Sequence, residues 1–107
     1  MAWTYLLIAG IFEVVWAIGL KYSEGFTRPY PSAITVAGMV ISFYFLSLAT
    51  KVLPIGTAYA IWTGIGAVGA VIIGMIFLNE PRDLIRIAFV ALIVIGIIGL
   101  KYTSASA

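Results

Sequence analysis

The sequence of 107 residues contains no cysteine and no histidine, and only 9% of its residues are charged. Without cysteine the chain can form no disulfide framework. Without either residue type it also lacks the usual zinc ligands and a Cys/His nucleophile pair. We therefore expect neither a metal site nor a bound cofactor. Proton chemistry near neutral pH, for which histidine is the usual side chain, would have to fall to a carboxylate.

Polar sequence is also scarce, because 64% of the residues are hydrophobic and the mean hydropathy is +1.18. A soluble domain is roughly half apolar and about a quarter charged. The composition therefore indicates that lipid is the solvent, and the length allows one domain, residues 1–107. The basic residues are scattered singly at segment ends, which is typical of membrane anchoring and argues against a nucleic-acid partner.

Four stretches are apolar enough to cross a membrane, which takes about 20 residues. They cover approximately residues 3–20, 32–50, 57–78 and 85–102. Short polar connections with proline and glycine separate them and leave no sequence for a soluble domain. We predict an all-α, multi-pass membrane protein with four transmembrane helices in a single domain.

Glu13 is the only charged residue well inside any of these spans. A charge at a helix centre costs at least ~2.5 kcal/mol and usually faces the bundle interior or an aqueous cavity. Helical spacing places Gly10, Trp16 and Ala17 beside it. The small residues leave space for a ligand, and the indole offers an N–H donor and a π face for a cation. We interpret Glu13 as a binding residue; the alternative is a protonated glutamate that joins two helices.

Further candidates lie in the second and third spans. Tyr59 and Trp62 are three residues apart, so they share a helix face, and each combines an aromatic body with a polar tip. For Tyr59 the alternative is the aromatic belt of the membrane interface. Ser42 lies at the middle of its span, where the alternative is a hydrogen bond to its own i−4 carbonyl. Gly64 and Gly66 weaken the third span and predict a kink or hinge.

Together these features resemble the small multidrug resistance family of membrane transporters along the whole chain. The resemblance rests on the mid-helix Glu13, the run "LPIGTAYAIWTGIGAVGA", and the loop "EGFTR" before a proline-started second helix. Within that family, "FEVVWAIGLKYSEGF", with Trp16 after the glutamate, and "IGIIGLK" resemble the guanidinium-exporter subtype. The quaternary-ammonium subtype usually lacks that tryptophan.

The resemblance implies a transporter and not an enzyme, located in the cell (inner or plasma) membrane of a prokaryote. It implies an antiparallel, dual-topology homodimer in which the two Glu13 side chains share one site and act by alternating access. The family's hinge glycines match Gly64 and Gly66. The family's hydrogen-bonded shell around the glutamate matches Trp16, Ser42, Tyr59 and Trp62. The expected activity is proton-coupled export of guanidinium and small substituted guanidinium ions.

Elementary electrostatics agrees with this expectation. Two carboxylates that face each other at low dielectric cannot both be ionised cheaply, so the pair would hold either protons or a cation. A planar guanidinium pairs with a carboxylate through two parallel hydrogen bonds. Three other functions stay open at this point: a proton-coupled exporter of quaternary ammonium cations, a small ion channel, and an accessory membrane subunit with no transport of its own.

The basic residues specify the orientation of the chain only weakly. The side that carries both termini has Lys51, Lys101 and the amino terminus. The opposite side has Lys21, Arg28, Arg82 and Arg86. Under the positive-inside rule this is a small bias, so we predict that the chain inserts in both orientations.

This prediction is tested by adding charge. Three lysines added at the C-terminus should hold that end inside, and three added to the 22–31 loop should hold it outside. Each biased variant alone should lose transport, and co-expression of the two should restore it. A C-terminal reporter that is active on one side of the membrane measures the populations. The antiparallel dimer would be contradicted if the wild-type chain inserts in only one orientation and a variant held in one orientation still transports normally.

Overall fold

The structure, a computed structural model, describes residues 1–103 and contains four α-helices over that range. The helices have 20–23 residues each, which corresponds to about 30–35 Å at the α-helical rise. That length matches the ~30 Å hydrocarbon core of a bilayer. All four are apolar enough to span it, which confirms the predicted number of transmembrane helices. They are α1 (Ala2–Tyr22), α2 (Pro29–Ala49), α3 (Ile55–Phe77) and α4 (Leu84–Thr103).

Prolines mark the beginning of two helices. The second helix begins at Pro29, three residues before the apolar stretch predicted from the sequence. Proline suits the first helical turn because its φ is already helical and its missing N–H needs no acceptor there. The Ser32 hydroxyl donates to the Arg28 carbonyl oxygen (2.5 Å) within the same turn. Pro54 likewise stands immediately before α3.

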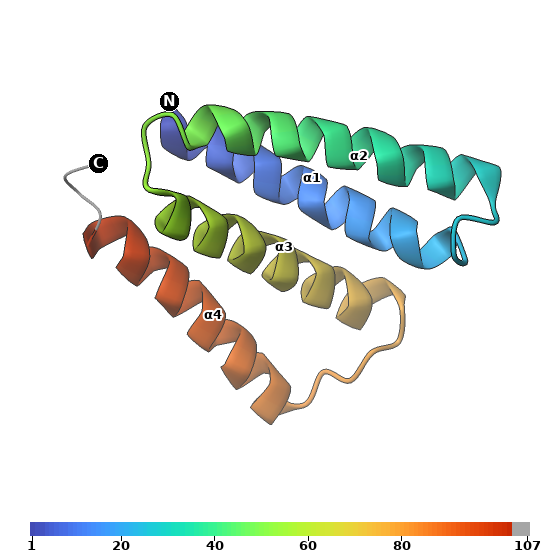
Figure 1. Cartoon of the computed structure of the whole chain (residues 1–107). Coiled ribbons are helices and arrows are strands. Elements are labelled where there is room, and N and C mark those ends of the chain that lie inside the picture. Colours follow the sequence, from blue (N-terminus) through green and yellow to red (C-terminus); the bar gives the residue numbers. More distant parts are fainter. Residues whose placement is uncertain (104–107) are drawn as a thin grey trace.

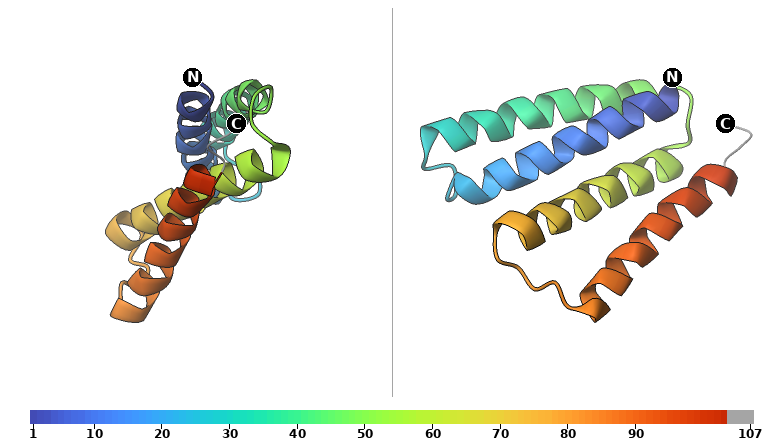
Figure 2. Two further views of the ribbon diagram at one scale, coloured as in Figure 1. Left: turned by 90° about the vertical axis from the view of Figure 1, so that its left-hand side faces the viewer. Right: turned by 180° about the vertical axis from the view of Figure 1, so that it is seen from behind.

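The helices form an open layer and not a closed four-helix bundle (Figures 1 and 2). The layer measures 44 × 34 × 17 Å. The first helix packs against both α2 and α3, whereas the backbone of α4 approaches only α3. Figure 1 shows that α4 diverges from α3 toward the α3–α4 connection. The start of α1 and the end of α4 therefore lie at the same end of the molecule.

The connection between α3 and α4 is held by Glu80. Its backbone N–H donates to the carbonyl oxygen of Gly74 (3.1 Å). Its carboxylate lies against Gly74, where an added Cβ would collide with it. The same carboxylate accepts a hydrogen bond from the Arg86 guanidinium (2.8 Å), which joins the connection to the first turns of α4. A charge therefore fixes the direction in which α4 leaves α3.

The buried core is small and lies among α1, α2 and α3. It comprises Ala2, Leu6, Ala9, Ala49, Leu53, Ala58, Ile61 and Trp62. None of the described residues of α4 is buried, although it is a strongly apolar helix. The accessible surface is 6630 Å², compared with roughly 5,800 Å² for a compact soluble protein of this mass. The apolar exterior suits contact with lipid or with another polypeptide.

Candidate functional site

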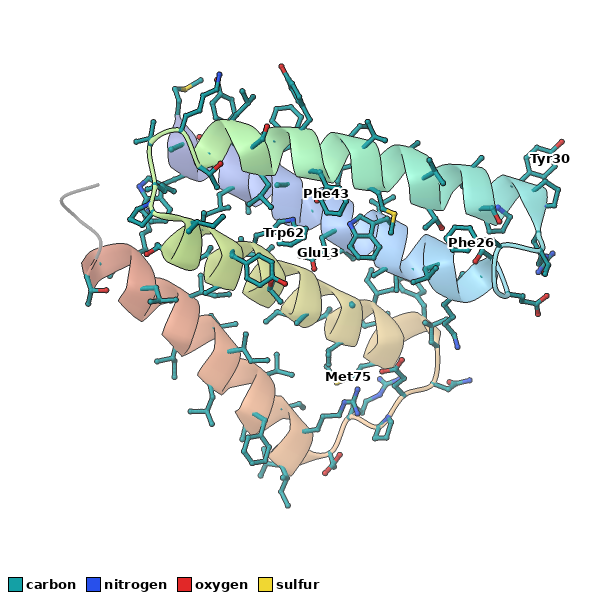
Figure 3. All side chains as sticks on the ribbon, in the orientation of Figure 1. Glu13, Phe26, Tyr30, Phe43, Trp62 and Met75 are labelled. Carbon is teal, nitrogen blue, oxygen red and sulfur yellow. The ribbon has the colours of Figure 1, made fainter. Side chains whose placement is uncertain are left out.

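The carboxylate of Glu13 lies between α1 and α3, close to the middle of both helices. In the view of Figure 3, Glu13 projects toward the α3 ribbon. It rests against Gly66, which is buried, and a Cβ added at Gly66 would collide with the carboxylate itself. The Oε1 atom of Glu13 is buried and has no hydrogen-bond partner among the described residues. The structure thus holds one unsatisfied carboxylate oxygen at mid-span depth.

A hydrogen-bonded chain links three helices beside this carboxylate. The Ser42 hydroxyl of α2 donates to the carbonyl oxygen of Ala9 on α1 (2.6 Å). The same hydroxyl accepts a hydrogen bond from the Trp62 indole N–H of α3 (2.9 Å). All of these polar atoms lie in the buried part of the layer. The alternative that the sequence left open for Ser42, a bond to its own i−4 carbonyl, is wrong, because the hydroxyl donates across to α1 instead.

Aromatic rings form a continuous wall across the three packed helices. The ring centroids of Tyr59 and Trp62 are 5.5 Å apart, and those of Trp62 and Phe43 are 5.7 Å apart. Phe43 in turn makes an edge-on contact with Trp16, at 6.4 Å. Trp62 is only 7% exposed, whereas Tyr59 is 56% exposed and forms the outer end of the row. The row joins residues of α1, α2 and α3.

Trp16 is positioned by a small residue of α2. Its backbone and Cβ lie against Gly38, where any added Cβ would be within 3.0 Å of the Trp16 Cβ. The Trp16 indole Nε1 is buried, and no hydrogen-bond acceptor for it lies within the described residues. Glu13 and Trp16 therefore present one unpaired acceptor and one unpaired donor from the same face of α1.

The structure places the remaining sequence candidates in packing contacts. Gly10 lies against the Ile65 side chain, where it allows α1 and α3 to approach each other. Gly64 lies against Ile97 and Ile93, at the contact with α4. The third helix is continuous through residues 64–66. The hinge assigned to Gly64 and Gly66 stays a prediction, and Gly10 contacts an apolar side chain and not the carboxylate.

Phe43 is the site residue that the sequence analysis missed. It bridges the two tryptophan rings, which no other side chain does among the described ring contacts. In sequence it is one of several aromatic residues in α2, and nothing in its spacing separates it from neighbours that face lipid. The only signal for Phe43 in the sequence was its position next to Ser42. That signal is weak, because adjacent residues of a helix do not share a face.

Chemically, the site combines a carboxylate oxygen that lacks a hydrogen-bond partner with the ring of Trp16 on the same face of α1. A cation placed there would neutralise the carboxylate, and aromatic faces attract cations within about 6 Å. A proton is the smallest species that would satisfy the same oxygen. Fold and sequence together define a small polytopic membrane protein with a single carboxylate, that of Glu13, near the centre of its described spans.

Comparison with known proteins agrees with this class. The sequence matches the family model described as "Small Multidrug Resistance protein" over residues 1–93. The chain therefore belongs to the small multidrug resistance family of membrane transporters, as the sequence motifs predicted.

Curated bacterial relatives match the chain along nearly its whole length. It is 58% identical to the "Guanidinium exporter" of Escherichia coli (strain K12) over 104 residues. This alignment covers 97% of the present chain and 99% of the relative. It is 59% identical, with the same coverage, to proteins of that name from Citrobacter freundii and Salmonella typhimurium. With bacterial relatives and four membrane-spanning helices, the chain is a multi-pass plasma-membrane protein.

The hydrogen bonds of Ser42 predict a measurable contribution to stability. Ser42→Ala leaves the buried Trp62 N–H without its acceptor and removes the hydroxyl donor that links α2 to the Ala9 carbonyl oxygen of α1. Because an unsatisfied buried group costs about 1–3 kcal/mol, the variant should unfold at a clearly lower temperature in detergent.

Ser47→Ala is the matched control on the same helix. The Ser47 hydroxyl is exposed and donates only to the nearby Tyr44 carbonyl oxygen (2.6 Å). The free energy of unfolding of Ser47→Ala should therefore stay within about 0.5 kcal/mol of the wild-type value, and its midpoint temperature should stay close to that of wild type. Equal midpoints for the two variants would contradict a stabilising role for the Ser42 hydroxyl.

Proposed function

We propose that this protein exports guanidinium and small substituted guanidinium ions in exchange for protons, with Glu13 as the shared binding residue for both. The observation that carries the proposal is the buried Glu13 Oε1 without a hydrogen-bond partner. The protein also belongs to a family in which closely similar members are named guanidinium exporters. A guanidinium ion supplies a positive charge and a fork of N–H donors that fits a carboxylate.

The aromatic residues support a small planar cation. The rings of Trp16, Phe43 and Trp62 contact one another across α1, α2 and α3, and a delocalised guanidinium can stack on such faces while its N–H groups point at oxygen. The Ser42–Trp62 bond fixes one indole in place. In this proposal Trp16, Ser42, Tyr59 and Trp62 orient the site, and Gly66 gives the carboxylate its space.

The proposal includes a homodimer of two antiparallel copies that work by alternating access. Its support is the openness of the single chain: the layer is 17 Å thick, and the described residues of α4 are all at least partly exposed. A second layer would enclose the two Glu13 side chains, and the small basic bias allows both orientations. Two enclosed carboxylates then exchange protons for one cation.

The aromatic wall also fits a second candidate, export of quaternary ammonium ions. Such ions are recognised by aromatic faces and offer no N–H donors. They would leave the Glu13 oxygen without a hydrogen bond, whereas guanidinium would satisfy it. Comparing guanidinium with tetramethylammonium in the same assay separates the two functions.

The proposed function is tested with purified protein in liposomes that contain a pH-sensitive dye. Added guanidinium should drive proton movement across the membrane with wild-type protein. Glu13→Gln should abolish this movement, because the amide neither binds a proton nor carries charge. Glu24→Gln, which changes an exposed carboxylate in the connection between α1 and α2, should retain it. Normal coupled transport by Glu13→Gln would refute the proposal, and guanidinium flux without proton movement would instead indicate a channel.

Guanidinium affinity should depend on pH in a defined direction. Protonation of Glu13 removes the charge that binds the cation, so the apparent affinity should weaken as pH falls through the titration of this residue. Each proton displaced contributes up to about tenfold per pH unit. Calorimetric titrations across the pH range measure the slope, with Glu24→Gln as the control. A pH-independent affinity would place the exchanged proton elsewhere.

A further inference from the structure

A groove lies on the side of the molecule where α1 begins and α4 ends, away from Glu13. It has a volume of about 310 Å³ and runs between α1 and α4, whose backbones do not touch, with α3 as its floor. Its walls are apolar along the span and polar only at the end. The lining residues are Trp3, Thr4, Leu6, Leu7, Ile61, Ile65, Ile97 and Lys101.

The polar end of the groove carries a positive charge. The Lys101 Nζ lies 5.7 Å from the centroid of the Trp3 ring, at the distance of a cation–π contact. Among the described residues, Lys101 has no carboxylate partner, because the one salt bridge there joins Arg86 and Glu80. Glu13 lies at mid-span, and the other acidic residues, Glu24, Glu80 and Asp83, lie in the connections at the opposite end.

The depth of these groups corresponds to the lipid headgroup level. Trp3 is in the first turn of α1 and Lys101 is in the last turn of α4. The amides of a first helical turn have no acceptor within their helix and favour an anion. Thr4 adds an exposed hydroxyl on the same wall. Hydrogen-bond donors and the positive charge of Lys101 therefore lie at the headgroup end of the groove, and apolar side chains line the rest of it.

We propose that this groove binds one anionic phospholipid. The lipid phosphate contacts the Lys101 ammonium and the Thr4 hydroxyl, and one acyl chain lies along Leu7, Ile65 and Ile97. Charge complementarity selects this occupant, since a cation would be repelled by Lys101 and a neutral apolar segment would leave it unpaired. The lipid also fills the space between the start of α1 and the end of α4, whose backbones do not touch.

A lysine at the end of a span also has a general role, because it extends its charge toward the interface. Lys51 provides the comparison. It follows α2 at the same end of the molecule and is exposed, but it does not line the groove. Of the described lysines, only Lys101 lies over an aromatic ring. A general interfacial role predicts equal behaviour of the two lysines, whereas a built lipid site predicts a difference.

The test uses the purified protein in mild detergent with added phosphatidylglycerol or phosphatidylcholine of identical acyl chains. Native mass spectrometry counts the lipids retained. Wild type should retain phosphatidylglycerol preferentially. Lys101→Gln should lower that retention by about fivefold, whereas Lys51→Gln should change it by less than about twofold. Lys101→Arg should keep the preference, which shows that loss in Lys101→Gln reflects charge and not misfolding.

A second variant tests the apolar part of the groove. Leu7 is 52% exposed and lines the groove wall, so Leu7→Trp fills the channel while leaving Lys101 in place. It should reduce retention of both lipids. Equal effects of Lys51→Gln and Lys101→Gln would overturn the proposal, as would full retention by Leu7→Trp. If Leu7→Trp changes the oligomeric state of the protein but not its lipid retention, the proposal would also be overturned, and the groove would be assigned to contact with a second copy of the chain.

Discussion

Glu13 lies halfway along a membrane-spanning helix with one carboxylate oxygen buried and, among the described residues, no counter-charge. The rest of the site depends on this unfavourable placement. A charged residue at a helix centre costs about 2.5–3.5 kcal/mol by insertion measurements. The structure offers Glu13 space at Gly66 but no hydrogen bond to Oε1. A proton or a bound cation removes the cost, and no neighbouring side chain does. The proposed exchange site depends on this property.

The packing around Glu13 relies on small residues where a soluble protein would use large ones. In lipid, helices associate by close packing and interhelical hydrogen bonds because apolar surface gains little by burial. Gly38 receives Trp16 from α1, and Gly66 receives Glu13. The Ser42 hydroxyl then links α1, α2 and α3 through one oxygen. Substitution at these positions therefore changes the geometry of the site and the packing of the helices together.

The sequence predicted the number and type of helices well because hydropathy and span length depend on the bilayer and not on tertiary contacts. It placed the start of α2 three residues late, since Pro29 begins a helix before the apolar run does. The family resemblance placed Ser42 and Trp62 in one hydrogen-bonded shell, but the bond from Ser42 to Ala9 was not foreseen. A hydroxyl that bonds to α1 looks the same in sequence as one that bonds its own helix. The sequence analysis missed Phe43, whose role depends on which face of α2 meets α1 and α3.

The position of Glu13 along α1 bears on why an antiparallel pair suits this site. The helix runs from residue 2 to residue 22, so its midpoint is residue 12 and Glu13 is one residue away, about 1.5 Å along the axis. Inverting the chain in the membrane therefore hardly changes the depth of the carboxylate. One layer, 17 Å thick, holds less than two helix diameters of about 10–12 Å each, so it has no enclosed interior of its own. Two layers of opposite orientation would bring both Glu13 side chains to the same depth in one enclosed cavity. A glutamate one or two turns nearer either end of α1 would separate the two carboxylates by about 11–22 Å instead, and they could not share one cation.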